Sequence, residues 1–269
     1  MSDKKFTIIK IPVTHTEHYG FETITQQQEI AYDHRMRLKN IRLITNDDYS
    51  GNALHYILKN TYDALGRLSK KELDNYSYPN SEYTAPLQTV NYAYNIRGWL
   101  SNINNPDELG NDLFAQKIQY TNYMQELGQT EQHAQYNGNI SSIQWTTAQG
   151  VEAYAYTYDK QNRITKAQYG YKGSNGMQIT NAYSEPTIEY DKHGNILSLQ
   201  RYGAPAEQEL IDDLEYMYRG NKLTAVHDKG NQLKGFANNA ANQHEYDYDA
   251  AGNMIRDDNS HSSKIEYHY

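Results

Sequence analysis

Acidic side chains late in the chain are the first residues that could do chemistry, because their spacing partly matches a calcium-binding loop. Asp247, Asp249, Gly252 and Asp258 occupy positions one, three, six and twelve of such a loop. Position five is Ala251, the bidentate glutamate is missing, and the flanking residues alternate like strands, whereas a calcium loop of this type lies between helices. We therefore interpret the segment as a hairpin and expect no metal site there.

Histidines and a serine-based triad are the next candidates for chemistry. His15 and His18 would point to opposite faces of a strand, and no spacing in the chain gathers the three or four ligands of a zinc site. His133 and Asp213 have no serine in a nucleophile-elbow setting, and no phosphate-loop or dinucleotide-binding motif occurs. The sequence predicts no catalytic residue, no metal ligand and no cofactor, and therefore a protein that is not an enzyme.

A recurring Tyr-Asp pair is the third candidate, in this case for carbohydrate binding. Tyrosine rings can stack on sugar faces, and aspartate can accept hydrogen bonds from sugar hydroxyls. Hairpin formation also explains the pair, since tyrosine suits a half-buried strand and aspartate suits the turn that follows it. Catalysis needs one site, whereas stacked hairpins need many copies. We therefore favour the structural interpretation and keep carbohydrate contact as the alternative.

These pairs belong to a unit that recurs along the chain and predicts a β-hairpin. Residues 151–158 alternate with period two, which is typical of a strand. The tyrosine is followed by Asp or Asn, then by two variable residues, and then by Gly or Asn. This order predicts a tight turn with positive φ, and an aliphatic residue starts the return strand. Tyr32 and Tyr136 are expected to anchor two further units, and the Tyr136 unit has a shortened turn. The residues that define the repeat are Tyr62, Asp63, Gly66, Tyr94, Gly98, Tyr158, Asp159, Tyr190, Asp191, Gly194, Tyr218, Gly220, Tyr248, Asp249 and Gly252.

The composition supports thin sheets and excludes several classes of partner. The 269 residues include 27 tyrosines but only 4 phenylalanines and 2 tryptophans, and a tyrosine ring can be buried while its hydroxyl reaches water. The formal net charge of -8 argues against nucleic acid and anionic membranes, which require concentrated basic residues. Because there is no cysteine, disulfides, zinc ribbons and thiol nucleophiles are excluded.

The beginning of the chain shows no signal peptide. The apolar stretch at 8–13 is interrupted by Lys10 and Pro12, so it is too short and too polar for a signal-peptide core or a membrane span. The cellular location is therefore left open by the sequence.

Taken in register, these blocks resemble the YD (tyrosine–aspartate) repeats of the Rhs family over residues 29–269. The block at 94–104 is especially similar to the repeat variant of Bacteroidetes members. The resemblance implies an all-β fold in which successive antiparallel hairpins join into one continuous curved or spiralling sheet. In large relatives, which are typically secreted or at the cell surface, this sheet forms a hollow shell around a toxic C-terminal segment. About eight hairpins would give only a fragment-sized shell or barrel-like turn.

From this resemblance we expect residues 1–28 to form strands continuous with the sheet and residues 29–269 to form the repeat array, as one structural domain. The function expected is a non-enzymatic scaffold, part of or derived from the encapsulating shell of an Rhs-type polymorphic toxin. The alternative is an extracellular carbohydrate-binding or adhesive module. The expected partner is protein, either a toxin segment or further repeats of a larger chain, with a glycan as the alternative and nucleic acid excluded.

Two further features are expected from the open sheet. Its edges, near 6–13 and 262–269, carry unpaired backbone groups that could pair with another copy of the chain. Two segments, 107–116 and 206–214, have weak helical signals: the first contains Glu, Leu and Ala, and the second follows Pro205 with acids in its first turn.

Overall fold

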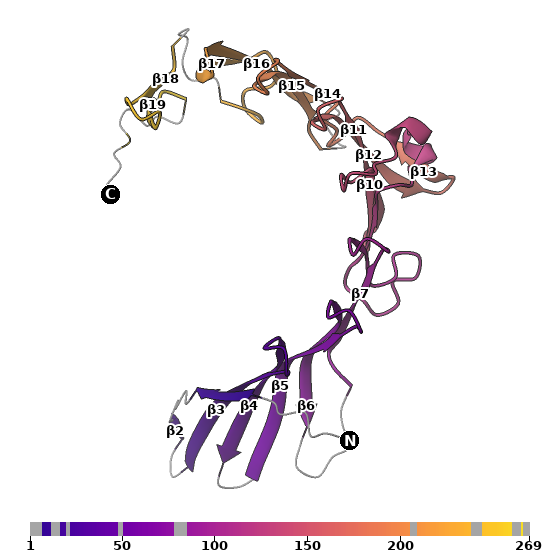
Figure 1. Cartoon of the computed structure of the whole chain (residues 1–269), viewed down its shortest axis with the longest axis vertical. Helices are drawn as coiled ribbons and strands as arrows, with labels where there is room; N and C mark the ends of the chain where they lie inside the picture. The colour runs from indigo at the N-terminus through magenta and orange to yellow at the C-terminus, as the bar shows by residue number, and fades with distance from the viewer. Residues whose placement is uncertain are drawn as a thin grey trace. The chain divides into compact units, whose positions relative to one another are not determined.

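The computed structural model describes residues 7–11, 17–19, 22–47, 51–77, 85–204, 209–237, 244–259 and 265. In these residues the fold is all-β, with antiparallel strands and two single-turn 3-10 helices, η1 (Gln125–Leu127) and η2 (Glu131–His133) (Figure 1). The prediction of an all-β fold built from antiparallel hairpins is confirmed. Within the described part of the chain, no helix is long and apolar enough to cross a membrane.

The chain divides into two compact units, Met1–Lys117 and Ile118–Tyr269. We refer to them as unit 1 and unit 2. In unit 1 the strand order is β1-β3-β4-β5-β6-β7-β8-β9, and β2 pairs with β3 beside this path. The strands are β1 (Thr7–Ile11), β2 (Glu17–Tyr19), β3 (Glu22–Tyr32), β4 (Leu38–Asp47), β5 (Gly51–Tyr62), β6 (Leu68–Ser77), β7 (Gln88–Tyr94), β8 (Leu100–Ile103) and β9 (Ala115–Gln119).

Unit 2 contains the end of β9 and three groups of strands. Gln119, the last residue of β9, accepts a hydrogen bond from the Ser141 amide, and the order then continues β10-β11-β12-β13. A four-stranded sheet, β14-β15-β16-β17, and a two-stranded sheet, β18-β19, follow. The strands are β10 (Ser142–Thr147), β11 (Gly150–Tyr158), β12 (Ile164–Gly173), β13 (Gly176–Ile179), β14 (Thr187–Tyr190), β15 (Ile196–Tyr202), β16 (Leu210–Arg219), β17 (Lys222–Asp228), β18 (Tyr246–Tyr248) and β19 (Met254–Asp257).

The main-chain ladder between hairpins is interrupted after β13. Main-chain contact from β12 to the segment before β14 includes an isolated bridge, Ala167 with Glu185, and a hydrogen bond from the Thr180 amide to the Tyr169 carbonyl (3.4 Å). Side chains take over at this point: the Gln168 amide donates to the Thr180 carbonyl (2.9 Å), and the Tyr169 amide donates to the Ser184 hydroxyl (3.0 Å). Side-chain hydrogen bonds therefore add to the few main-chain bonds at this junction.

Both helical predictions are wrong. The described part of 206–214 lies in β16, where Leu210, Asp212 and Leu214 alternate with period two, and pairing with both neighbouring strands overrides the weak helical start signal. Residues 107–116 form turns and the start of β9, because Gly110 has φ +56° and the Asp112 amide closes a turn onto Leu109.

The core of unit 2 consists of small, separate clusters. Met124 and Leu127 pack on Ala153 and Ala155 of β11, and Met177 contacts this cluster. A second cluster contains Leu214, Val226 and Tyr246, with partly buried Leu199, Tyr216, Leu223, Phe236, Tyr248 and Met254 packed against it. Clusters of this size fit thin sheets whose faces are only partly covered.

The two predicted edges of the sheet are residues 6–13 and 262–269, and the first is the better described. Strand β1 is the first in the sheet order, so residues 7–11 form an edge of the described sheet. The other predicted edge, 262–269, lies outside the described residues except for Ile265, whose amide donates to the Ile255 carbonyl (2.9 Å). Strand β3 runs through residue 28, where the repeat array was expected to begin.

Candidate functional site

Every regular Tyr-Asp block closes its hairpin with the same hydrogen-bonded turn. After Tyr62, the Asp63 amide donates to the Arg67 carbonyl (2.8 Å), and the Gly66 amide donates back to the Asp63 carbonyl (3.0 Å). The Asp63 carboxylate also accepts from the Arg67 amide (2.9 Å), and Gly66 has φ +91°, a value that favours glycine. The same two main-chain bonds follow Tyr32, Tyr94, Tyr158, Tyr190 and Tyr248.

A bulge accompanies each of these turns. Tyr62 pairs with Leu68 while Thr61 pairs with Lys70, so Ser69 is an extra residue on the return strand. The Ser69 hydroxyl donates to the Thr61 carbonyl (3.1 Å), as the equivalent threonine hydroxyls do at two other bulges. The register shift recurs before Tyr32, Tyr94, Tyr158, Tyr190, Tyr218 and Tyr248. A bulge at a fixed place gives each strand pair the same local twist.

A second set of contacts joins one hairpin to the next, and we call it the inter-repeat latch. The Arg67 guanidinium is held by Asp63 of its own turn (Nε to Oδ2, 2.7 Å) and lies over the ring of Tyr94, 4.6 Å from the ring centroid. The Tyr94 hydroxyl donates to the Leu68 carbonyl (2.8 Å), the first residue after the preceding turn. Each tyrosine is thereby fixed by the hairpin before it.

The latch recurs in both units. Cations lie over the next tyrosine ring for Arg37 on Tyr62 (4.3 Å), Arg163 on Tyr190 (4.5 Å) and Lys222 on Tyr248 (5.4 Å). Phenol hydroxyls donate to the preceding hairpin from Tyr62 to Leu38 (2.7 Å), Tyr158 to Ile140 (2.7 Å) and Tyr190 to Ile164 (2.8 Å). The repeat-defining tyrosines of these units are therefore committed to neighbouring repeats.

Two units depart from this geometry. The Gly220 unit is a two-residue turn in which Arg219 pairs directly with Lys222. Tyr136 lies outside any strand in the connection 120–141 and is 63% exposed, so the prediction that it anchors a strand is wrong. Ile140 nevertheless accepts the Tyr158 phenol, as the aliphatic residues of the regular units do. The inserted connection explains why the spacing around Tyr136 is irregular.

The turn aspartates have depressed pKa values because the folded turn supplies donors to their carboxylates. The hydrogen bond from the Arg37 guanidinium, with two backbone amides and against the opposing effect of burial, lowers the pKa of Asp33 to about 2. The Arg163 amide and guanidinium lower the pKa of Asp159, and Asn253 lowers the pKa of Asp249. The charged form of each carboxylate therefore favours the folded state.

We expect the stability of the array to fall in acid because of these turns. A depressed folded pKa gives stability that is complete above the ordinary aspartate pKa of 3.8 and is lost as the pH drops towards about 2. Urea unfolding measured at steps from pH 7 to pH 2 should show this loss. In Asp159→Asn the free energy of unfolding should fall less between pH 7 and pH 2. The neutral side chain of Asn95 already accepts the same two backbone amides in its own turn, so an asparagine can close this turn without a charge. Identical pH profiles for Asp159→Asn and the parent chain would contradict this account.

A separate group of aromatic side chains lies on strands β10, β11 and β12 and on Tyr183, and it does not belong to the latch. Cross-strand pairs place Trp145 beside Glu152 and Tyr154 beside Tyr169. The Trp145 and Tyr154 rings are stacked with centroids 5.8 Å apart, and the Tyr154 and Tyr169 centroids are 5.4 Å apart. The Tyr183 ring meets Tyr169 edge-on at 5.4 Å. Burial raises the pKa of Tyr154 to about 12, so its phenol stays neutral.

The Glu152 carboxylate lies within this aromatic group. One oxygen accepts from the Trp145 indole (2.9 Å), and the other accepts from the Tyr169 phenol. Burial, together with this bond to Glu152, raises the pKa of Tyr169. A cavity of about 340 Å³ opens here and is lined by Glu152, Tyr169, Tyr171, Gln149 and Thr180, among others. We call it the Glu152 cleft.

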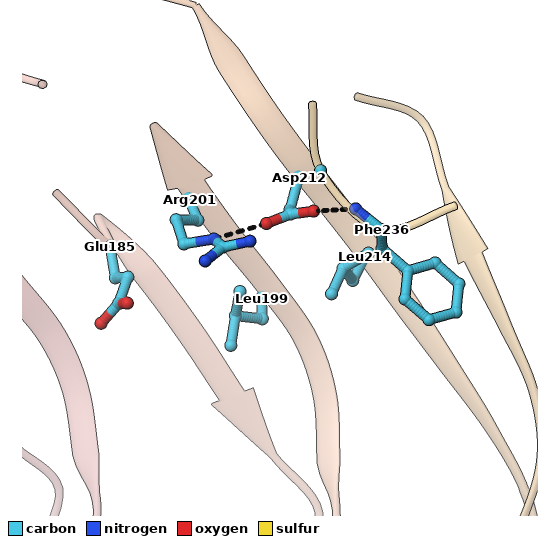
Figure 2. Close-up of a pocket in the computed structure, with 7 residues that line it drawn as sticks. Glu185, Leu199, Arg201, Asp212, Leu214 and Phe236 are labelled. Carbon is cyan, nitrogen blue, oxygen red and sulfur yellow. Dashed lines mark hydrogen bonds and ion pairs between the residues drawn. The ribbon is translucent and has the colours of Figure 1, made fainter. Parts of the chain in front are cut away.

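A second cavity of about 350 Å³ is lined in part by Asp212, whose side chain is almost completely buried (Figure 2). The Arg201 guanidinium donates to one carboxylate oxygen (2.5 Å), and the Phe236 amide donates to the other (2.6 Å). Gly235 approaches so closely that an added Cβ would lie 2.2 Å from the Ile211 carbonyl. Asp212 therefore holds the segment before residue 237 against β16, and both of its oxygens are used for this purpose.

The other residues considered for chemistry are placed in structural contacts. Asp247 is paired with Arg256 (2.6 Å), and Asp249 closes its own turn with Asn253 (2.8 Å). Asp213 accepts from the Gln200 amide (3.1 Å), and His133 ends η2. Among the described residues, no three acidic or histidine side chains form a group that could hold a metal ion. His15 lies outside the described residues.

The sequence predicted the tyrosines and turn aspartates of the latch, but not its cations and not the residues of the cleft. The latch cation stands five residues after the tyrosine in Arg37, Arg67 and Arg163, and this recurrence is visible in the sequence. The Glu152 cleft has no such signal, because Trp145 and Glu152 come together only through the register of β10 and β11.

Comparison with known proteins gives structural likeness alone. No family model matches the chain, and no curated protein matches it. The crystal structure of TcdB2-TccC3 without its hypervariable C-terminal region is similar at 11% identity and a TM-score of 0.26, covering 88% of this chain and 18% of that one. The crystal structure of TcdB2-TccC3 is 10% identical with a TM-score of 0.20, covering 92% of this chain and 19% of that one. The crystal structure of TcdB2-TccC3-TEV is 12% identical with a TM-score of 0.22, covering 91% of this chain and 17% of that one. The chain spans less than a fifth of the length of these structures.

Proposed function

We propose that this chain is a non-enzymatic structural scaffold of the YD-repeat type, part of or derived from the encapsulating shell of an Rhs-type polymorphic toxin. The observation that carries the proposal is the latch, which uses the same turn, cation and phenol contacts in successive hairpins. Arrays in which each unit contacts its neighbours build extended surfaces by repetition.

The chemistry of the repeat residues supports a structural role. In the latch, each phenol donates to a carbonyl of the preceding hairpin, and each aspartate accepts from amides of its own turn. In this proposal these groups hold the turns and join neighbouring hairpins. The proposed partner is a protein, either an enclosed toxin segment or further repeats of a larger chain. The carbohydrate-binding or adhesive module stays the alternative prediction for the array.

Co-expression with the C-terminal toxin segment of an Rhs-type protein tests this proposal. We expect the segment to resist a protease concentration that degrades it when it is expressed alone, and its toxicity to fall. A variant with Tyr94→Ala and Tyr190→Ala, which breaks one latch in each unit, should lose this protection. Tyr171→Ala, outside the latch, is the matched control and should keep it.

Two results would count against containment. One is a segment that stays fully protease-sensitive and toxic beside the intact chain. The other is protection that survives when the latches are broken, because that would separate protection from the architecture of the array.

A further inference from the structure

We propose that the Glu152 cleft binds a neutral carbohydrate, with the Tyr171 ring as its stacking surface and the Glu152 carboxylate as the acceptor for sugar hydroxyls. The site lies on β11, β12, the turn before β11 and Thr180 just after β13, and it uses none of the latch residues. Loss of binding at this site would therefore leave the proposed scaffold function untouched, and the two proposals are tested separately.

Glu152 is held in a fixed position at the wall of the cavity. The Trp145 indole and the Tyr169 phenol each donate to one of its oxygens, so the carboxylate is oriented from two sides. An ionised carboxylate offers about four acceptor positions, and these two bonds use two of them. The remaining positions allow Glu152 to accept from hydroxyl groups of a bound molecule without losing its protein contacts.

Tyr171 differs from the tyrosines of the repeat turns. It stands two residues after Tyr169 on β12 and pairs across with Glu152, so it lies on the face of the cleft. Its side chain is 41% exposed. Among the described residues, its phenol has no hydrogen-bond donor or acceptor and its ring has no aromatic or cationic partner. An exposed aromatic ring beside an oriented carboxylate gives the apolar and polar halves of a sugar-binding surface.

The charge of the cleft selects the class of ligand. Lys172 and Glu152 both line the cavity, so the cleft has one basic and one acidic residue and no excess charge that would favour a cationic or an anionic ligand. A neutral ligand with many hydroxyls can use both, together with the Gln149 amide and the Thr180 hydroxyl. The cavity of about 340 Å³ is at the small end of ligand pockets, which range over roughly 300–1,000 Å³. This size suits a mono- or disaccharide.

Saturation-transfer NMR on the whole chain tests the site. The probes are the methyl glycosides of glucose, galactose, mannose and N-acetylglucosamine, with glucosamine and glucuronate as charged comparators. We expect at least one neutral glycoside to bind and both charged sugars to bind more weakly. Tyr171→Ala should raise the dissociation constant about tenfold, because one stacking contact is lost. Tyr171→Phe should raise it less, because the ring remains.

Controls separate binding from folding. Tyr171 is exposed, so its variants should keep the circular dichroism spectrum and urea midpoint of the parent chain, and Glu152→Gln provides a second loss of affinity without removing a side chain. Tyr136→Ala, an exposed tyrosine that does not line the cavity, should leave binding unchanged. Absence of binding by all four neutral glycosides, preference for a charged sugar, or equal affinity in Tyr171→Ala and the parent chain would overturn the proposal.

Discussion

Replacing Tyr190 with alanine is expected to lower the free energy of unfolding of unit 2 by about 3 kcal/mol, at the low end for truncating a large aromatic side chain. The variant loses three contacts at once. The ring no longer packs between β14 and the preceding turn, the Arg163 guanidinium loses the ring it lies over at 4.5 Å, and the Ile164 carbonyl loses its phenol donor at 2.8 Å. Urea unfolding followed by Trp145 fluorescence, in a Trp99→Phe background, reports on unit 2 because the chain has only 2 tryptophans.

Companion variants divide this loss among the contacts. Tyr190→Phe removes only the hydroxyl and should cost about 1 kcal/mol. A double-mutant cycle of Tyr190→Ala with Arg163→Ala should give a coupling energy of about 0.5–1 kcal/mol for the ring–guanidinium contact. Tyr171→Ala, an exposed tyrosine of the same unit, should stay within about 0.5 kcal/mol of the parent chain. If Tyr190→Ala cost no more than Tyr171→Ala, the latch would have no role in stability.

The latch explains why one residue type is repeated so often in this chain. The tyrosine of each unit needs a partner that only the preceding unit supplies, and the cation after each turn needs a ring that only the next unit supplies. Stability then depends on neighbouring pairs, as in other repeat arrays, and no large core is required. The small clusters around Leu127 and Leu214 agree with this picture.

The turns could be predicted from the sequence because all of their contacts are local. Asp63, Gly66 and Arg67 lie within five residues, and the turn uses the side-chain acceptor and positive φ that their types suggest. The alternation before each turn likewise gave the strands, as in residues 151–158. Local sequence therefore predicts the structure of each hairpin, but not its contacts with neighbouring hairpins.

The contacts between hairpins could not be predicted in the same way. Arg163 lies over a ring 27 positions further along the chain, and Gln168 and Ser184 meet only because the ladder stops after β13. The helical prediction for 206–214 failed for a related reason, since a short acidic segment with leucines fits either period until its neighbours are known. Such contacts depend on register, which the local pattern does not fix.

Gly170 is a position at which a single added methyl group is expected to be costly. The chain makes a close crossing at this residue: an added Cβ would lie 2.3 Å from Leu127 Cδ2 and 2.7 Å from the Gln178 carbonyl oxygen. Leu127 is buried against Ala153 and Ala155, and Gln178 is held in β13, so neither neighbour can move freely. Gly170→Ala should therefore lower the free energy of unfolding of unit 2 by about 2–3 kcal/mol, the range for overpacking a core.

Gly173→Ala is the matched control for this prediction, because it makes the same change three residues further along β12. There the added Cβ meets only the end of the flexible Gln178 side chain, which can rotate away. The cost should stay below about 1 kcal/mol, and a lower backbone entropy of the unfolded chain offsets part of it. The double variant Gly170→Ala and Leu127→Ala should cost less than the sum of the two single variants if the clash with Leu127 is the cause. Equal effects of Gly170→Ala and Gly173→Ala would instead show that η1 does not depend on close approach to the sheet.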